Sequence, residues 1–161
     1  EDQQMNYDEK LLVGYRWYDR KAKDPLFPFG HGLSYTQFQY SDLEIKMGDS
    51  NEVSCSFMIE NIGDNIGAEV AQCYVAFENS GNDEPIKTLQ GFAKETIRVG
   101  DKKTVEIRLN QRNFSYWDVE SKCWKIRQGS YQILIGSSAT LIHLKETLRL
   151  EPVEEVLDPL I

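Results

Sequence analysis

Apolar and polar residues alternate along most of the chain after residue 40. Residues 42–47 read DLEIKM and residues 52–60 read EVSCSFMIE. The odd-numbered positions from 43 to 47 and from 53 to 59 are all apolar. A period of two is typical of a β-strand with one face in a core. The pattern recurs at residues 68–78, 86–97, 104–109, 122–126, 131–136 and 141–150. The sequence therefore predicts about eight short strands, and no segment has the period of an amphipathic helix.

Turn residues separate these segments. Residues 61–67, NIGDNIG, consist largely of Asn, Asp and Gly, which tolerate positive φ angles, and residues 79–85 read as a loop. Gly91 interrupts an extended segment and predicts a β-bulge. Short strands at this spacing predict an all-β fold, an antiparallel β-sandwich.

Two aromatic residues near the C-terminus bear on the type of sandwich. Tyr131 opens a late strand just after a glycine turn, which resembles the tyrosine corner of immunoglobulin-like sandwiches. Trp124, a few residues earlier, is a candidate for the core between the sheets. The alternative is that both are ordinary strand aromatics, and the architecture is a sandwich in either case.

The first 40 residues follow neither period. Their densest part, PLFPFGHGLSYTQF at residues 25–38, holds three phenylalanines, a tyrosine, a histidine and two glycines. Such a segment predicts an irregular arm rather than a strand or helix. Its aromatic rings need a surface to pack on, because burying one such side chain contributes roughly 1.5–3 kcal/mol.

Composition excludes several functional classes. Of the 161 residues, 40% are hydrophobic and 27% are charged, which are values of a globular chain. A net charge of −8 repels phosphate backbones, so nucleic-acid binding is disfavoured. No apolar run approaches the roughly 20 residues of a membrane span, so no membrane partner is expected. The acidic start is unlike a signal peptide and lacks an initiator methionine, and we expect an excised or processed piece.

The residues that usually carry chemistry form no recognisable site. Cys55, Cys73 and Cys123 are widely spaced, and Cys55 has the pattern of a small buried side chain. Unpaired cysteines lean slightly toward a reducing, cytoplasmic compartment, which otherwise stays unknown. His31 and His143 have no nucleophile oriented beside them by any local rule, and the acidic residues cluster in turns. The sequence therefore predicts no catalytic residue, metal site or cofactor.

Several motifs carry a resemblance to a known family. The segments VGYRWYD (13–19) and PLFPFGHGLSYTQFQYSDL (25–43) are similar to the end of the second catalytic domain of glycoside hydrolase family 3, which includes β-glucosidases and β-xylosidases. NIGDNIGAEVAQCYV, PIKTLQGFAK, WDVESKCW and GSYQILIGSSA then resemble its C-terminal fibronectin type III-like domain, in the expected order. The resemblance covers about residues 6 to 150. One departure is Lys10, where the family commonly has glycine.

The resemblance implies three segments in this chain and places the catalytic residues of the family outside it. Residues 1–38 would be a remnant of the preceding catalytic domain with its linker, residues 39–151 the fibronectin type III-like sandwich, and residues 152–161 an acidic tail. The nucleophile and the acid/base of the family's retaining mechanism lie in regions that these residues do not match. We therefore expect a non-catalytic module, inactive alone, whose parent is a β-glucosidase-type hydrolase.

The expected partners of this module are the missing N-terminal catalytic domains. The aromatic arm would pack between those domains and the sandwich, which makes eight residues candidates for interdomain contacts: Arg16, Trp17, Tyr18, Phe27, Phe29, His31, Tyr35 and Phe38. Two alternatives remain open. One is a stand-alone carbohydrate-binding or adhesion module that uses exposed rings such as Trp117, and the other is an oligomerisation domain that self-associates by exchanging its arm.

Overall fold

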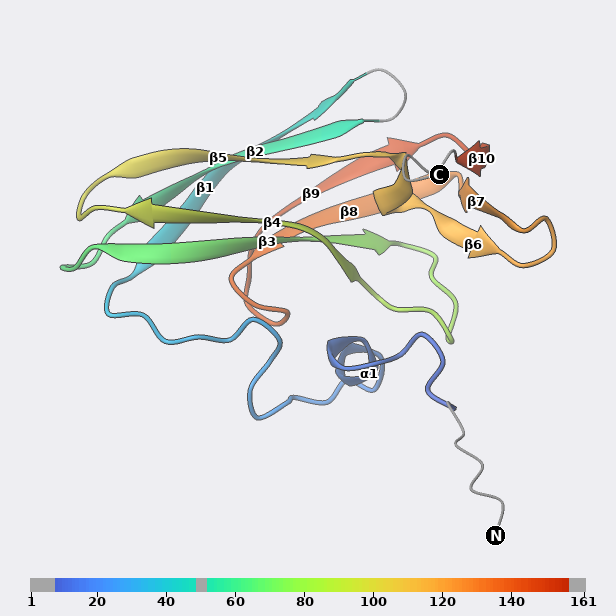
Figure 1. Cartoon of the computed structure of the whole chain (residues 1–161), viewed down its shortest axis with the longest axis horizontal. Helices are drawn as coiled ribbons and strands as arrows, with labels where there is room; N and C mark the ends of the chain where they lie inside the picture. Colours follow the sequence, from blue (N-terminus) through green and yellow to red (C-terminus); the bar gives the residue numbers. More distant parts are fainter. Residues whose placement is uncertain (1–7, 49–51, 157–161) are drawn as a thin grey trace, which may run out of the picture.

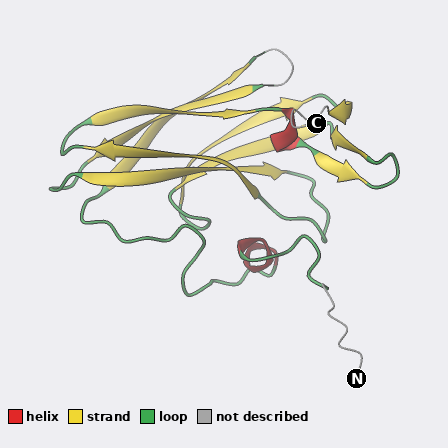
Figure 2. Cartoon of the chain, in the orientation of Figure 1, coloured by secondary structure: helices red, strands yellow, loops and turns green. Residues whose placement is uncertain are grey.

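The computed structural model describes residues 8–48 and 52–156. Within these ranges ten β-strands dominate, with one short α-helix and one 3₁₀ helix (Figures 1 and 2). The helices are α1 (Tyr15–Arg20) and η2 (Gln111–Phe114). The strands are β1 (Phe38–Met47), β2 (Val53–Asn61), β3 (Gly67–Phe77), β4 (Thr88–Ile97), β5 (Lys102–Leu109), β6 (Tyr116–Asp118), β7 (Cys123–Ile126), β8 (Gly129–Gly136), β9 (Ile142–Leu150) and β10 (Val153–Val156).

The strands form two facing sheets and a small third one. One sheet has the order β1-β2-β5 and the other the order β4-β3-β8-β9, while β10-β7-β6 form a short sheet at one end (Figure 1). All strand pairs are antiparallel. The predicted all-β antiparallel sandwich is thereby confirmed.

The core lies between the two large sheets and follows from the alternation in the sequence. In β2 the side chains of Val53, Cys55, Phe57 and Ile59 are each at most 1% exposed. Alternate residues of β3, β5, β8 and β9 meet them from the other strands. Cys55 is a small buried side chain with a free thiol, as predicted.

The pairing register shifts at four places, in the pairs β1–β2, β3–β4, β8–β9 and β7–β10. Between β3 and β4 the register passes from Cys73–Gly91 to Tyr74–Leu89, which leaves Gln90 as the extra residue of a bulge and confirms the prediction. Gly91 is needed there because a Cβ atom would lie 2.7 Å from a methyl group of Ile107 on the facing sheet.

The strand β1 departs from its prediction. It begins at Phe38, four residues earlier than the alternation indicated, and its register with β2 shifts between Ser41 and Glu44. Asp42 takes a φ of 56° at this irregularity. Met47, predicted on the buried face, is 51% exposed, because it ends the strand.

Four elements were not predicted from the sequence: α1, η2, β6 and β10. The helix α1 spans only six residues and none of them is buried, so it has no apolar stripe to detect. The strands β6 and β10 have three and four residues, too few for a visible period. β10 lies in the segment that was assigned to the acidic tail, and it pairs with β7, whereas residues 157–161 lie outside the described residues.

A tyrosine corner closes the turn before β8. The hydroxyl of Tyr131 donates a hydrogen bond to the backbone carbonyl of Arg127, four residues earlier, at 3.0 Å. Its ring, which is 3% exposed, packs against Phe77 and Phe114 with centroid distances of 4.9 and 5.8 Å. Tyr131 is therefore a corner and not only a strand aromatic.

The corner predicts a specific loss of stability. Tyr131→Phe keeps the ring packing and removes the hydroxyl, which leaves the Arg127 carbonyl without this donor. We expect the free energy of unfolding in urea to fall by about 1–2 kcal/mol.

Tyr35→Phe is the matched control, since the Tyr35 side chain is 96% exposed. It should leave the unfolding midpoint unchanged. Equal stability of the Tyr131→Phe variant and the unaltered protein would show that the corner hydrogen bond contributes nothing net.

Candidate functional site

The N-terminal arm, residues 8–37, lies on the outer face of the β4-β3-β8-β9 sheet, away from the sandwich core (Figure 1). In β3 the residues that alternate with the core positions are buried beneath it, with Gln72, Tyr74 and Ala76 at most 8% exposed. The ring of Tyr15 meets Tyr74 edge-on at a centroid distance of 5.7 Å. The arm is therefore a third layer of the structure.

Polar contacts attach the helical part of the arm to the β3–β4 connection. The guanidinium of Arg20 donates to the carbonyls of Gly81, at 2.7 Å, and of Glu84. Lys87 and Asp19 form an ion pair whose side chains are only 11% and 15% exposed. These contacts hold α1 at a fixed place beside residues 80–89.

Two further contacts join the arm to the β3–β4 connection, one from Tyr15 of α1 and one from Lys10 before it. The hydroxyl of Tyr15 accepts a hydrogen bond from the backbone N–H of Leu89 at 2.8 Å. Lys10, the position where family 3 commonly has glycine, takes the left-handed φ of 52°, and its ammonium pairs with Asp83 at 2.9 Å. The lysine thus keeps the backbone conformation that glycine favours and adds a contact to the loop.

The second half of the arm joins the sandwich at two further places. The carbonyl of Phe29 accepts from the backbone N–H of Ala139 at 2.8 Å. Gly30, with φ 80°, lies so close to Gln72 that a Cβ atom would overlap that side chain. A glycine is therefore required where the arm crosses β3.

Asn61, a fully buried side chain, fixes the end of the arm. It accepts from the hydroxyl of Thr36 at 2.5 Å and donates to the carbonyls of Asn65 and Ile97 at 2.8 and 2.9 Å. The amide is satisfied within the fold, as a buried polar group must be. It ties the start of β1 to two neighbouring turns.

The structure separates the eight predicted contact residues into three groups. Arg16 and Trp17 are half-buried in α1, and Phe38 is half-buried in β1 against the sandwich core. The others are on the surface of the arm: Tyr18, Phe27, Phe29, His31 and Tyr35.

Four further exposed apolar residues of the arm were not among the candidates, and two of them are almost fully exposed: Leu26 at 88% and Leu33 at 97%, against 57% for Leu11 and 55% for Val13. The signal that could have identified Leu26 and Leu33 is an apolar residue inside a segment rich in proline and glycine, with no strand or helix period. Together with Phe27 and Tyr35 these two leucines are the most exposed large apolar side chains of the arm, and we call these four residues the apolar patch.

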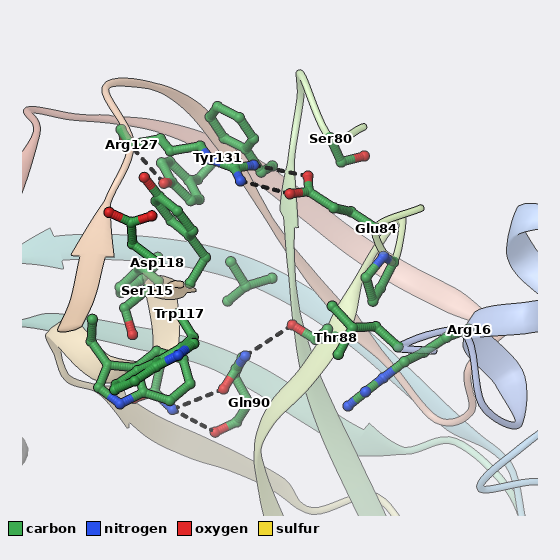
Figure 3. A pocket seen from close by; sticks show the side chains of 18 of the residues that line it. Arg16, Ser80, Glu84, Thr88, Gln90, Ser115, Trp117, Asp118, Arg127 and Tyr131 are labelled. Atoms are coloured by element: carbon green, nitrogen blue, oxygen red, sulfur yellow. Dashed lines mark hydrogen bonds and ion pairs between the residues drawn. The ribbon is translucent and has the colours of Figure 1, made fainter. Parts of the chain in front are cut away.

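A cleft of about 600 Å³ opens between the arm and the small sheet (Figure 3). Its lining comes from α1, from the β3–β4 connection, from η2 and from the β6–β7 hairpin. Trp117 lies on one side and Arg16 on the opposite side, with Gln90 between them (Figure 3).

Ion pairs hold two carboxylates of the cleft, those of Glu84 and Asp118, in their charged form. Glu84 receives two hydrogen bonds from Arg127, at 2.6 and 2.8 Å, and these lower the pKa of the Glu84 carboxyl. Asp118 accepts from Lys125 at 2.8 Å and from Ser121, and the pKa of Asp118 falls to about 2. A glycosidase needs one carboxyl group that stays protonated as the general acid, and neither of these has that property.

The described residues offer no other chemistry of the kinds sought. Along residues 8–48 and 52–156, no group of three or more His, Cys, Asp or Glu side chains is arranged to hold a metal ion. In the same ranges, no helix has the length and apolar character that crossing a bilayer requires. His143 stacks on Tyr40 at a centroid distance of 4.2 Å and contacts the hydroxyl of Ser137, as a residue on a sheet face.

Comparisons with known proteins match this chain to one domain family and to β-glucosidases. The fibronectin type III-like domain family matches residues 69–139. Thermostable beta-glucosidase B of Acetivibrio thermocellus is 43% identical over 152 residues, which cover 92% of this chain and 20% of that protein. Probable beta-glucosidase H of Emericella nidulans is 44% identical over 137 residues, or 83% of this chain and 16% of that protein.

Solved structures give the same result. The GH3 beta-glucosidase of Bifidobacterium adolescentis superposes with a TM-score of 0.91 at 29% identity, over 98% of this chain and 23% of that one. The beta-glucosidase of Kluyveromyces marxianus in complex with glucose superposes with a TM-score of 0.89 at 34% identity, over 95% of this chain and 18% of that one. The chain belongs with the C-terminal region of family 3 β-glucosidases.

The fibronectin type III-like module spans about one fifth of the length of the relatives that it matches. The predicted resemblance to glycoside hydrolase family 3 is confirmed. The predicted interdomain role of the arm residues stays a prediction, because the comparisons concern whole segments and not single side chains.

Arg20 should control how firmly the arm is attached. In an Arg20→Ala variant the bonds to the 80–84 loop are lost, so the arm should open more often. We expect hydrogen–deuterium exchange of residues 15–23 to accelerate about tenfold or more, which corresponds to about 1.4 kcal/mol or more of local opening free energy.

Arg98→Ala is the control, because Arg98 is exposed in the turn between β4 and β5. It should leave exchange in the arm unaltered. Exchange in β8 should stay within about twofold in both variants, since the sandwich core is untouched. Unchanged exchange of residues 15–23 after Arg20→Ala would contradict the anchoring role.

Proposed function

We propose that this chain works as the non-catalytic C-terminal module of a family 3 β-glycosidase, and that its arm docks against the catalytic domains that precede it. In this role it stabilises those domains and shapes the rim of their substrate cleft. The parent would hydrolyse terminal β-D-glucosyl or related residues with retention of configuration, using carboxylates that lie outside this chain.

The observation that carries the proposal is the contrast between the residues that anchor the arm to the sandwich and the apolar residues of the arm that stay exposed. Its inner side is anchored to the sandwich by Arg20, Asp19 and Tyr15, whereas the four side chains of the apolar patch are 71–97% exposed. Large apolar side chains held at fixed places on a surface are typical of an interaction site. A docking partner would bury them at little entropic cost, since the backbone is already ordered.

The position of the arm also favours docking within one polypeptide. The relatives that match this chain extend well beyond it, and the arm is the part of the chain that a preceding domain would reach first. Self-association through the arm is not part of the proposal.

The isolated chain should be unable to hydrolyse glycosides. We expect no release of nitrophenol from nitrophenyl β-glucoside or β-xyloside above a buffer blank, because Glu84 and Asp118 are held ionised. Activity that survives a second purification, and that Glu84→Gln removes, would contradict the non-catalytic assignment.

The apolar patch should matter only when the preceding domains are present. In the longer protein that carries those domains, Leu33→Ser combined with Tyr35→Ser should lower the unfolding temperature by about 3 °C or more. In the isolated chain the same pair should leave it unchanged, because both side chains are at least 96% exposed.

Met47→Ser is the matched control, since Met47 is an exposed apolar residue of β1 on the other sheet. It should be neutral in both proteins. A double substitution in the patch that is neutral in the longer protein, or that destabilises both proteins equally, would refute docking through the patch.

A further inference from the structure

The cleft between the arm and the β6–β7 hairpin has one aromatic wall. Trp117 is 47% exposed and its ring meets Trp124 at a centroid distance of 5.1 Å and an interplanar angle of 63°. Trp124 packs against the sandwich core and is covered by the guanidinium of Arg112. Trp117 is therefore a supported ring with much of its surface left to solvent.

Side-chain amides form the polar part of the same cleft. Asn113 donates to the Gln90 side-chain oxygen at 3.1 Å, and Gln90 donates to the hydroxyl of Thr88 at 2.9 Å. An amide side chain has two donors and two acceptor lone pairs, more than these two bonds use at Gln90. Gln90 is thus fixed in orientation and retains a donor and an acceptor for a ligand, whereas the amide nitrogen of Asn113 already donates to two oxygens of Gln90 and its oxygen accepts from Asn110.

Charged residues of both signs line the cleft, namely Arg16, Arg127, Glu84, Asp118 and Glu120, and some of them are already paired. Arg127 is engaged twice by Glu84 and also lies over the ring of Tyr116 at 4.0 Å, while Lys125 is paired with Asp118. A phosphate or carboxylate would have to compete with a carboxylate already in place, and a cation would have to compete with Arg127 or Lys125. Because neither sign of charge is alone in the lining, a neutral ligand meets the least electrostatic opposition in the cleft.

We infer that this cleft binds a neutral β-linked oligosaccharide. In a β-glucopyranose the hydroxyl groups lie at the rim of the ring and axial C–H groups form flat apolar faces. Such a face fits against the indole of Trp117, and the rim hydroxyls fit the amide of Gln90. A volume of about 600 Å³ lies in the range of small-molecule sites.

The choice of a β-linked sugar rests on the proposed function, because a module of a β-glycosidase meets chains of that linkage. The site itself is separate from the apolar patch. Its lining residues include Trp117, Gln90 and Asn113 but none of Leu26, Phe27, Leu33 and Tyr35. A sugar held there would keep substrate near the enzyme and take no part in bond cleavage.

Isothermal titration calorimetry of the 161-residue chain with cellotriose tests the inference. We expect saturable binding that Trp117→Leu weakens about tenfold or more, because leucine keeps an apolar contact with Trp124 and removes the flat ring. Trp117→Phe should retain the affinity within about threefold, since it restores a planar ring. Thermal unfolding of both variants checks that each is folded.

Two controls set the specificity. Phe92→Ala removes an exposed ring outside the cleft and outside the apolar patch, and it should bind cellotriose as the unaltered chain does. Sorbitol, a polyol without a ring, should give no saturable heat. Absence of saturable cellotriose binding, equal binding by the Trp117→Leu variant, or equal weakening by Phe92→Ala would each overturn the inference.

The two proposals fail separately. If cellotriose does not bind while the patch variants still destabilise the longer protein, the sugar site is wrong and the docking role stands. If cellotriose binds and the patch variants are neutral, the docking role is wrong and the cleft remains a sugar site.

Discussion

The central strand β3 is buried on both faces, and the arrangement of the other elements depends on this constraint. Six consecutive residues, 71–76, are buried, which one sandwich core cannot achieve because alternate side chains of a strand point to opposite sides. The inner set faces the other sheet. The outer set, which contains Gln72 and Tyr74, needs a second cover, and the arm supplies it.

The polar atoms of that outer set are satisfied as well as covered. The amide of Gln72 donates to the carbonyl of Ser137 at 2.9 Å and accepts from the hydroxyl of Tyr74 at 2.5 Å. Burial of the Tyr74 ring contributes roughly 1.5–3 kcal/mol. Because the arm covers this surface, α1 is held beside the β3–β4 connection, and its position creates one wall of the cleft.

The same arrangement explains the division between structure and chemistry in this part of a family 3 protein. Glu84 and Asp118 near the cleft are paired with Arg127 and Lys125, so both carboxylates are held in their charged form. The arm carries four apolar side chains that stay 71–97% exposed. Both features fit the proposed role as a non-catalytic module.

Much of the sandwich could be predicted from local patterns. The period of two marked eight strands, Gly91 marked the bulge of β4, and the glycine turn before Tyr131 marked the corner. Each of these depends on one strand and its immediate neighbours. The short strands β6 and β10 could not be found, because three or four residues carry no measurable period, and they are stable only as partners of β7.

The sequence by itself determined the all-β class, the core face of most strands and the family, since alternation and ordered motifs are properties of the chain. Only the tertiary structure decided which side chains of the arm face inward. Tyr15 and Phe27 are both aromatic residues of one irregular segment, yet Tyr15 packs on Tyr74 and Phe27 is 71% exposed. A segment without a period has no fixed inner face until a partner surface is present, and here β3 provides that surface.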